Sequence, residues 1–271
     1  MTLKEKLRAC SQSRTALLAV NFYNFETLKG LLLAAQSTGN PLILQLSEGS
    51  IQYLGLNPAV AMARAMLKEY GVEGWIHLDH GNRIELVKAC LDAGFDSVMI
   101  DASEKSFEEN VSITREAVRI AAPYNANVEA ELGYVAKLGQ DQEAAPTPVD
   151  DAKRFSKATG IDALAIAIGN AHGFYKQTPK LNIERLREIR AVTTCALVLH
   201  GSSGIPDDQL QEAIRSGISK INLATETKNC FMKKLQQLLA DNEEIDLRKI
   251  FPKAILEVQQ LITRKLNIIQ P

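Results

Sequence analysis

The histidines of this 271-residue chain are the side chains that most directly suggest chemistry. Only four are present, and His80, His172 and His200 each follow a short apolar run. Three imidazoles that meet at one point can hold a divalent cation and leave an open coordination position, as in catalytic zinc sites. The sequence therefore predicts a catalytic metal site. His77 has the same strand parity as Asp79, so we expect it to be buried and hydrogen-bonded instead.

Carboxylates and glycine-rich turns accompany these histidines. The carboxylates that lie in or just after apolar runs are Asp79, Asp101, Glu129 and Glu131. Beside a divalent cation they can be ligands, orient an imidazole or carry a proton, and their spacing leaves these roles open. Glycine follows both His172 and His200, in the segments HGFYK and HGSSG. Such turns expose backbone N–H groups to an anion, so they predict a phosphorylated substrate.

Eight short apolar or β-branched runs carry these side chains near their carboxyl ends. The runs span residues 16–20, 42–46, 75–78, 97–100, 127–130, 163–168, 196–199 and 218–221. Stretches with helical spacing lie between them, at residues 26–37, 58–70, 83–93, 108–121, 150–159, 183–192 and 207–216. Apolar strands that alternate with helices form covered parallel sheets, and eight such units close a barrel with its active site at the strands' carboxyl ends. The sequence predicts an α/β protein with a single (β/α)8 TIM barrel.

The alternative architecture is an open, doubly wound sheet. Neither a GxGxxG nor a GxxxxGK[ST] motif follows any of the runs, which disfavours that fold. No linker-like segment or shift in composition divides the chain. We therefore expect residues 1–271 to form one domain.

The composition excludes several functional classes. The 31 basic and 32 acidic side chains give a net charge of about −1, without the concentrated basic surplus that nucleic-acid binding needs. No apolar stretch reaches the roughly 18–20 residues of a membrane helix, and the N-terminus has no signal-peptide pattern. The four cysteines form no CxxC pair. We expect a cytoplasmic protein that binds neither nucleic acid nor membranes.

Eight segments in a characteristic order carry a family resemblance. They are AVNFYNFE (19–26), LQLSEGSIQYLG (44–55), HLDHG (77–81), SVMIDAS (97–103), VEAELG (128–133), AIAIGNAHGFY (165–175), LVLHGSSGIP (197–206) and KINLATETK (220–228). Together they resemble the class II, zinc-dependent ketose-bisphosphate aldolases over nearly the whole chain. The resemblance implies a lyase of carbohydrate metabolism, as in glycolysis, that cleaves tagatose 1,6-bisphosphate, fructose 1,6-bisphosphate or a related ketose to dihydroxyacetone phosphate and an aldehyde such as glyceraldehyde 3-phosphate. It also implies a homodimer or homotetramer.

The resemblance assigns roles residue by residue. His80, His172 and His200 match the ligands of the catalytic Zn²⁺, and Asp79 matches the carboxylate that moves the proton of the C4 hydroxyl. The zinc ion would stabilise the enediolate left by C3–C4 cleavage. The other matched positions are Asp101 and Glu131 for a second or alternative metal position, Gly173, Lys176, Gly201, Ser203 and Thr225 for the phosphate, Asn222 for a substrate hydroxyl, and Asn24 and Ser47 for the sugar chain. A monovalent cation, Na⁺ or K⁺, is implied beside the phosphate loops.

Two parts of the chain depart from the family pattern. Relatives carry a Gly-Gly-x-Glu-Asp segment whose glutamate protonates C3, whereas residues 133–151 here are GYVAKLGQDQEAAPTPVDD. Glu143 is the best match for that acid, Asp141 is the next, and a loop without a catalytic acid is the third possibility. The NLATE segment favours the tagatose branch. Neither Arg248 nor Arg264 matches the family residue that binds the distal phosphate. A sugar-acid or deoxysugar phosphate is therefore an alternative for the aldehyde half of the substrate.

Two other functions compete with this one. A metal-free aldolase would form a Schiff base on a strand lysine, for which Lys220 is the candidate, but it would leave the three histidines unexplained. A paralogue with a degenerate loop would bind metal and phosphate and turn over little substrate.

Overall fold

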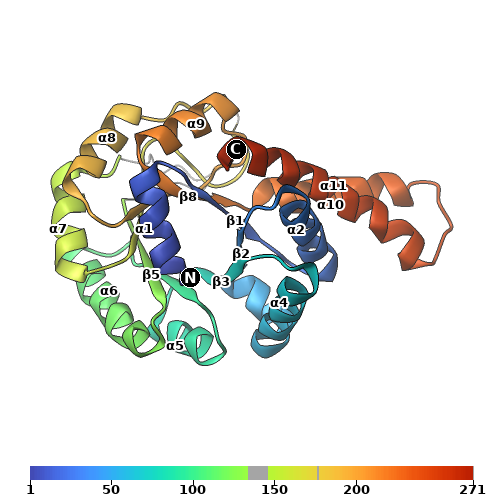
Figure 1. Ribbon diagram of the computed structural model, residues 1–271, viewed down its shortest axis with the longest axis horizontal. Helices are drawn as coiled ribbons and strands as arrows, with labels where there is room; N and C mark the ends of the chain where they lie inside the picture. Colours follow the sequence, from blue (N-terminus) through green and yellow to red (C-terminus); the bar gives the residue numbers. More distant parts are fainter. Residues whose placement is uncertain (134–145, 176, 271) are drawn as a thin grey trace.

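A closed barrel of eight parallel strands forms the centre of the protein (Figure 1). The computed structural model describes residues 1–133, 146–175 and 177–270. Its strands are β1 (Leu17–Asn21), β2 (Leu42–Ser47), β3 (Gly74–Gly81), β4 (Ser97–Ile100), β5 (Asn127–Leu132), β6 (Ala163–Ile166), β7 (Ala196–Leu199) and β8 (Ile218–Leu223). Neighbours in sequence pair in parallel, and β8 pairs with β1 to close the ring. The predicted TIM barrel is confirmed.

Helices surround this barrel on its outer side (Figure 1). Those that fall on predicted stretches are α2 (Phe25–Thr38), α4 (Leu56–Tyr70), α5 (Ile84–Asp92), α6 (Phe107–Ala121), α7 (Val149–Thr159), α8 (Ile183–Val192) and α9 (Asp207–Ser216). Helices that the periodicity did not predict are α1 (Leu3–Ser13), α3 (Glu48–Leu54), the 3-10 turn η1 (Ala122–Tyr124), α10 (Thr225–Leu239) and α11 (Leu247–Ile269). The outward-facing strand side chains and the inner faces of the helices form one large apolar core.

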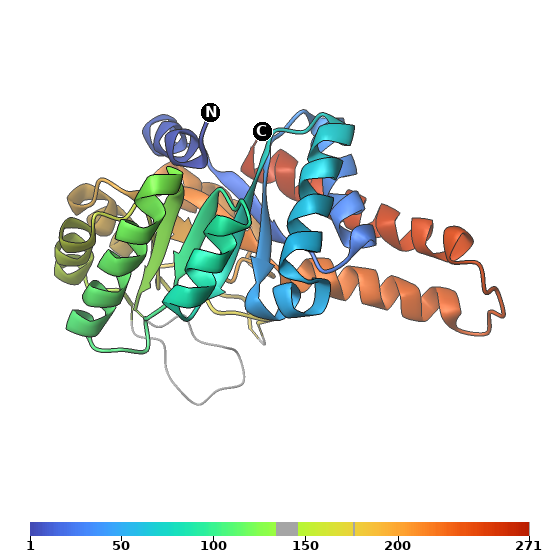
Figure 2. The same cartoon turned by 90° about the horizontal axis from the view of Figure 1, so that it is seen from below.

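Helix α1 covers the amino-terminal end of the barrel. It begins with a capping box in which the side chains of Thr2 and Glu5 bond each other's backbone N–H groups. Its buried face, which includes Leu3 and Leu7, packs against inward-facing strand residues such as Trp75. Figure 2 shows α1 at this end of the barrel. With one end closed by apolar side chains, the opposite end, at the carboxyl ends of the strands, is the mouth.

Helices α10 and α11 form an antiparallel pair that projects from one side of the barrel (Figures 1 and 2). The two helices pack on each other, and α11 also packs along α2. Large apolar side chains are exposed around the turn that joins them, notably Leu239, Ile245 and Leu247. No helix in the described part of the chain combines the length and apolar character needed to cross a bilayer.

The contact between α2 and α11 depends on a glycine. A Cβ atom on Gly30 would lie 2.7 Å from the Cβ of Val258 and 3.0 Å from the carbonyl oxygen of Ile255. The absent side chain lets the two helices approach closely, and this contact anchors the projecting pair.

We predict that Gly30→Ala lowers the free energy of unfolding by about 1–3 kcal/mol, because the added methyl group overpacks this contact. Chemical denaturation measures the change. The matched control is Gly49→Ala in α3, where a Cβ meets nothing within 4 Å, so that alanine should instead stabilise its helix by about 0.5–1 kcal/mol. A Gly30→Ala protein as stable as the Gly49→Ala control would contradict this account.

Candidate active site and metal centre

His80 reaches the barrel mouth through an irregularity in β3. The pairing of β3 with β4 shifts register between Leu78 and Gly81, and His80 has a φ of 52°. Residues other than glycine rarely adopt this left-handed conformation, and such strain concentrates at functional sites. The Nδ1 atom of His80 lies 2.7 Å from Asp101 Oδ2. This contact fixes the ring and leaves Nε2 available as a metal ligand.

The structure brings the three predicted metal-binding histidines together. Their ring centroids lie 5.0 Å apart for His80 and His172, 4.8 Å for His80 and His200, and 5.8 Å for His172 and His200. One ring nitrogen of each and a carboxylate oxygen of Glu131 lie within 4.8 Å of one another. Imidazoles with a carboxylate are a ligand set that suits Zn²⁺.

His200 supplies an independent test of whether a cation fits. Its Nδ1 atom is buried and makes no hydrogen bond within the part of the chain that the structure describes. The same atom faces a carboxylate oxygen of Glu131 at 3.3 Å. A buried polar atom without a hydrogen bond is costly, and a metal ion at this point would satisfy it. The residues therefore fit a divalent metal ion.

The protonation of the histidines shows how much negative charge faces the site. Burial lowers the pKa of His200, but its hydrogen bond to Glu129 and the charges of Glu129 and Glu131 outweigh it and raise that pKa to about 10. Burial also opposes protonation of His80, yet its pKa is raised by the charge of Asp79 and the hydrogen bond to Asp101. Without a metal, bound protons therefore balance these carboxylates, and a divalent cation would take over that charge.

The third histidine responds in the opposite direction. Burial, followed by the positive charges of His80 and His200, lowers the pKa of His172 to about 3. His172 is therefore neutral at ordinary pH, with a lone pair ready for a metal.

Asp79 is held by amide groups on both of its oxygens. Asn21 Nδ2 donates to Oδ2 at 2.8 Å, and Asn222 Nδ2 donates to Oδ1 at 3.3 Å. Gln45 Nε2 donates to Asn21 Oδ1 at 2.9 Å and so sets the orientation of that amide. Burial raises the pKa of Asp79, but the charges of His80 and His200 and the Asn21 hydrogen bond outweigh it and lower the pKa. Asp79 is thus an ionised, oriented carboxylate.

The glycine-rich turns line the same pocket as Asp79. Residues of this pocket that the sequence assigned to the substrate are Gly173, Gly201, Ser203, Asn222 and Thr225. Gly201 has a φ of 64°, and a Cβ there would lie 2.2 Å from the carbonyl oxygen of Ala171. Only glycine permits this close approach of two backbone segments. Helix α10 begins at Thr225, which also lines the pocket.

Two other predicted substrate residues act as helix caps in the structure. Asn24 caps α2, with its Oδ1 accepting from the Thr27 backbone N–H at 2.9 Å. Ser47 caps α3, with its Oγ accepting from the Ser50 backbone N–H at 3.3 Å. Both therefore have a structural use, and neither lines the pocket around Asp79.

The remaining predicted metal-binding, phosphate-binding and acidic residues lie outside the cluster of ligand atoms and outside the mouth pocket, or outside the described residues. Asp101 is outside the cluster of candidate ligand atoms, and it accepts hydrogen bonds from the backbone and hydroxyl of Ser103 in addition to its contact with His80. Arg264 lines a separate groove on α11, and Arg248 pairs with Asp246 in the projecting helices. Lys176, Asp141 and Glu143 lie outside the described residues.

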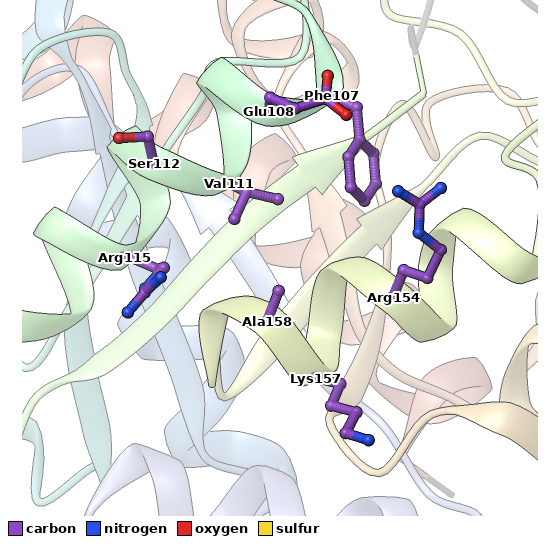
Figure 3. Close-up of a pocket in the computed structure, with 8 residues that line it drawn as sticks. All are labelled: Phe107, Glu108, Val111, Ser112, Arg115, Arg154, Lys157 and Ala158. Carbon is purple, nitrogen blue, oxygen red and sulfur yellow. The ribbon is translucent and has the colours of Figure 1, made fainter.

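A larger hollow lies on the outer surface of the barrel, between α6 and α7 (Figure 3). Phe107 and Val111 contribute apolar surface, Arg115 and Lys157 stand at its edge, and the guanidinium of Arg154 lies 4.6 Å from the centroid of the Phe107 ring. It contains none of the residues to which the sequence assigns chemistry. The mouth pocket is therefore the candidate active site, although it is the smaller hollow.

Glu129 lies deeper than the sequence suggested. It is fully buried inside the barrel, where its Oε1 is 2.9 Å from His200 Nε2 and its Oε2 is 2.7 Å from Lys220 Nζ. His77 is also fully buried and hydrogen-bonded, to Ser97 Oγ at 2.7 Å, as predicted. Sequence reasoning gave no specific role to Asn21, a polar residue just past the first apolar run, and did not single out Gln45, a polar side chain within the second run.

Comparison with known proteins shows the family of this chain. Residues 1–270 match the family described as fructose-bisphosphate aldolase class-II. The fructose-bisphosphate aldolase of Geobacillus stearothermophilus is 41% identical over 259 residues, which cover 92% of this chain and 90% of that protein. The 6-phospho-5-dehydro-2-deoxy-D-gluconate aldolase of Bacillus licheniformis is 36% identical over 273 residues, covering 98% and 94%.

A solved structure gives the same result. The crystal structure of the YdjI aldolase from Escherichia coli K12 matches with a TM-score of 0.88 and 30% identity, covering 99% of this chain and 96% of that one. The family match spans nearly the whole sequence, and the barrel mouth contains a ligand set suited to a metal ion. This chain therefore belongs to the class II fructose-bisphosphate aldolases, a metal-dependent family of carbon–carbon lyases that act on phosphorylated sugars.

Proposed function

We propose that this protein is a Zn²⁺-dependent aldolase that reversibly cleaves a ketose 1,6-bisphosphate to dihydroxyacetone phosphate and an aldehyde. One observation carries the proposal. The ligand atoms of His80, His172, His200 and Glu131 converge beside the ionised carboxylate of Asp79, and glycine-rich turns line the same pocket.

In this mechanism His80, His172 and His200 hold the metal. Zn²⁺, when bound, supplies a Lewis acid for the negative charge that develops on the dihydroxyacetone phosphate half. Asp79 takes the proton of the C4 hydroxyl while the C3–C4 bond breaks and its electron pair passes to C3. Asn21 and Asn222 hold the carboxylate in place for this transfer. Asp79 returns the proton in the condensation direction.

A second proton transfer must place a proton on C3. We assign this step to Glu143, with Asp141 as the alternative, because they are the acids on either side of Gln142, on which the glutamate position of the family falls. We also keep Asp101 and Glu131 as residues of a second or alternative metal position, since Asp101 bonds His80 and Glu131 belongs to the cluster of ligand atoms.

Substrate phosphate would bind at the glycine-rich turns. Gly173, Gly201, Ser203 and Thr225 surround the pocket, and the N-terminus of α10 offers backbone N–H groups and a favourable helix dipole. Lys176 would add a positive charge. We include Na⁺ or K⁺ beside these loops. Because the net charge is about −1, the attraction for an anion must be local.

We further propose that the chain works as a single-domain subunit of a cytoplasmic homodimer or homotetramer. The exposed apolar residues Leu239, Ile245 and Leu247 support a subunit interface at the projecting helices. Lys220 gives no support to a Schiff-base mechanism, because it is fully buried and paired with Glu129.

We predict that removal of metal by a chelator abolishes cleavage of the ketose bisphosphate and that added Zn²⁺ restores it, because no other described group replaces the Lewis acid. A coupled assay of released dihydroxyacetone phosphate measures both steps. Borohydride added during turnover should trap no substrate on Lys220. Full turnover without metal, or a trapped Lys220 adduct, would refute the mechanism.

We predict that Asp79→Asn lowers kcat/KM by about 100- to 10,000-fold, because the isosteric amide cannot accept the C4 hydroxyl proton. Steady-state kinetics and Zn²⁺ titration would be measured on the same protein. Zn²⁺ affinity should change little, since Asp79 is outside the ligand cluster. The matched control is Asp150→Asn, an exposed position at the start of α7. Near-normal turnover by Asp79→Asn would exclude Asp79 as the base.

The aldehyde half of the substrate can be identified by condensation. The substrates in the names of the relatives above would release different aldehydes. Cleaving the C3–C4 bond of a 6-phospho-5-dehydro-2-deoxygluconate gives dihydroxyacetone phosphate and 3-oxopropanoate. We predict that dihydroxyacetone phosphate condenses with glyceraldehyde 3-phosphate to the tagatose configuration, which the NLATE segment favours. Product stereochemistry by NMR decides the branch. A fructose-configured product, or reaction with 3-oxopropanoate alone, would contradict it.

A further inference from the structure

A cluster of charged side chains lies inside the barrel, beneath the metal site. Lys220 on β8, Glu129 on β5 and His77 on β3 are all fully buried. Lys220 Nζ is 2.7 Å from Glu129 Oε2 and 3.2 Å from His77 Nε2. None of the three lines the mouth pocket, and the mechanism above uses none of them. A buried ion pair often stabilises a core less than apolar side chains of similar volume would. The presence of this pair therefore suggests a functional role.

The donors and acceptors of this cluster follow from the chemistry of its members. An ammonium group only donates hydrogen bonds, so His77 Nε2 accepts from Lys220 and the His77 proton lies on Nδ1. That proton is donated to Ser97 Oγ at 2.7 Å, and Asn127 Nδ2 donates to the same oxygen at 3.0 Å. The ionised Glu129 only accepts.

The last contact of this cluster leads to the metal site. Because Glu129 Oε1 accepts at 2.9 Å from His200 Nε2, that ring nitrogen must carry a proton. With the Nε2 proton held by Glu129, the ring nitrogen left to bind a metal ion is Nδ1, the atom that faces Glu131. In His80 the opposite ring nitrogen, Nδ1, contacts a carboxylate, that of Asp101. His80 and His200 therefore have opposite ring nitrogens free of these carboxylates, and those are the nitrogens that would bind a metal ion.

We propose that Glu129 and Lys220 are positioning residues, which hold His200 in the one tautomer and orientation that aims Nδ1 at the metal. Glu129 accepts the Nε2 proton, and Lys220 keeps the second carboxylate oxygen engaged so that Glu129 cannot turn away. His77 Nε2 accepts a hydrogen bond from the Lys220 ammonium group and helps to hold it beside Glu129. This inference rests on the zinc site proposed above, and it gives Lys220 a use that is not that of a nucleophile.

Substitution of Glu129 by glutamine tests the tautomer directly. In Glu129→Gln, Lys220 attracts the amide oxygen and so turns the NH2 group toward His200. That NH2 group must find an acceptor at Nε2, which moves the His200 proton to Nδ1 and blocks the ligand atom. We expect Zn²⁺ affinity, measured on the full chain by competition with a chromophoric chelator, to fall about 10- to 100-fold, as is typical when a partner of a metal-binding histidine is lost.

A second variant separates positioning from a purely structural effect. In Glu129→Gln/Lys220→Met, the amide oxygen is free to turn to His200 and the NH2 group to His77 Nε2. We expect the double variant to bind Zn²⁺ more tightly than Glu129→Gln alone and to recover most of the loss. The stability control is Leu186→Ala, a buried position on α8 outside the barrel interior, which should leave Zn²⁺ affinity within about twofold of the parent protein.

Nitrogen-15 NMR of the Zn²⁺-loaded protein adds a readout that stability does not affect. The parent protein should show His200 with a protonated Nε2 and a metal-bound Nδ1, and Glu129→Gln should lose that Nε2–H signal. The proposal is wrong if Glu129→Gln keeps full Zn²⁺ affinity, if the double variant gains nothing over it, or if Leu186→Ala loses as much. These outcomes are independent of the proposed reaction, because a parent protein that binds Zn²⁺ and cleaves no ketose would overturn the function alone.

Discussion

The pairing of β8 with β1 is the constraint on which the site depends. It closes a sheet whose strands are all parallel, so every strand delivers its carboxyl end to the same ring. Side chains as far apart in sequence as Asn21 and Asn222 can then hold the two oxygens of one carboxylate. Opening this barrel between β1 and β8 would place the two strands at opposite edges and would separate these groups.

Charge balance explains why the mouth suits a metal ion. Several carboxylates face the histidines there, and the pKa values of His80 and His200 are raised as a result. Burial, followed by these same positive charges, lowers the pKa of His172. Two bound protons balance the charge of the carboxylates but occupy ring nitrogens of His80 and His200. One doubly charged ion would balance the same charge and bind a nitrogen of all three rings. The buried Lys220 balances Glu129 one level lower.

Local geometry at the mouth is shaped by backbone that regular strands do not provide. The left-handed His80 and the glycine at position 201 each occupy a conformation or a space that an ordinary side chain would not tolerate. The rest of the fold holds these points in place, since α1 fills the opposite end of the barrel and the surrounding helices cover its outside. The strained backbone at His80 persists because the packing of the surrounding structure holds it in place.

Much of the fold and of the metal site could be predicted from sequence because both depend on local patterns. Apolar runs mark strands, and the residue that follows a run, such as His172 or His200, lies at the mouth of any closed parallel barrel. The helices α10 and α11 were not predicted, because they follow the last strand and pack on each other and on α2 instead of lying between two strands of the barrel. Asn24 and Ser47 likewise gave no sign that they cap helices.

The sequence by itself determined that the three histidines and Asp79 follow apolar runs and so lie at the mouth, and the tertiary structure decided which other residues join them and how deep and in which orientation each one lies. Glu129 and Glu131 differ by two positions in one strand, yet Glu129 pairs with Lys220 in the barrel interior while Glu131 joins the metal cluster. Depth depends on the register of neighbouring strands, and the choice of ring nitrogen in His80 and His200 depends on partners from other strands. These are long-range pairings, which no local pattern of residue types encodes.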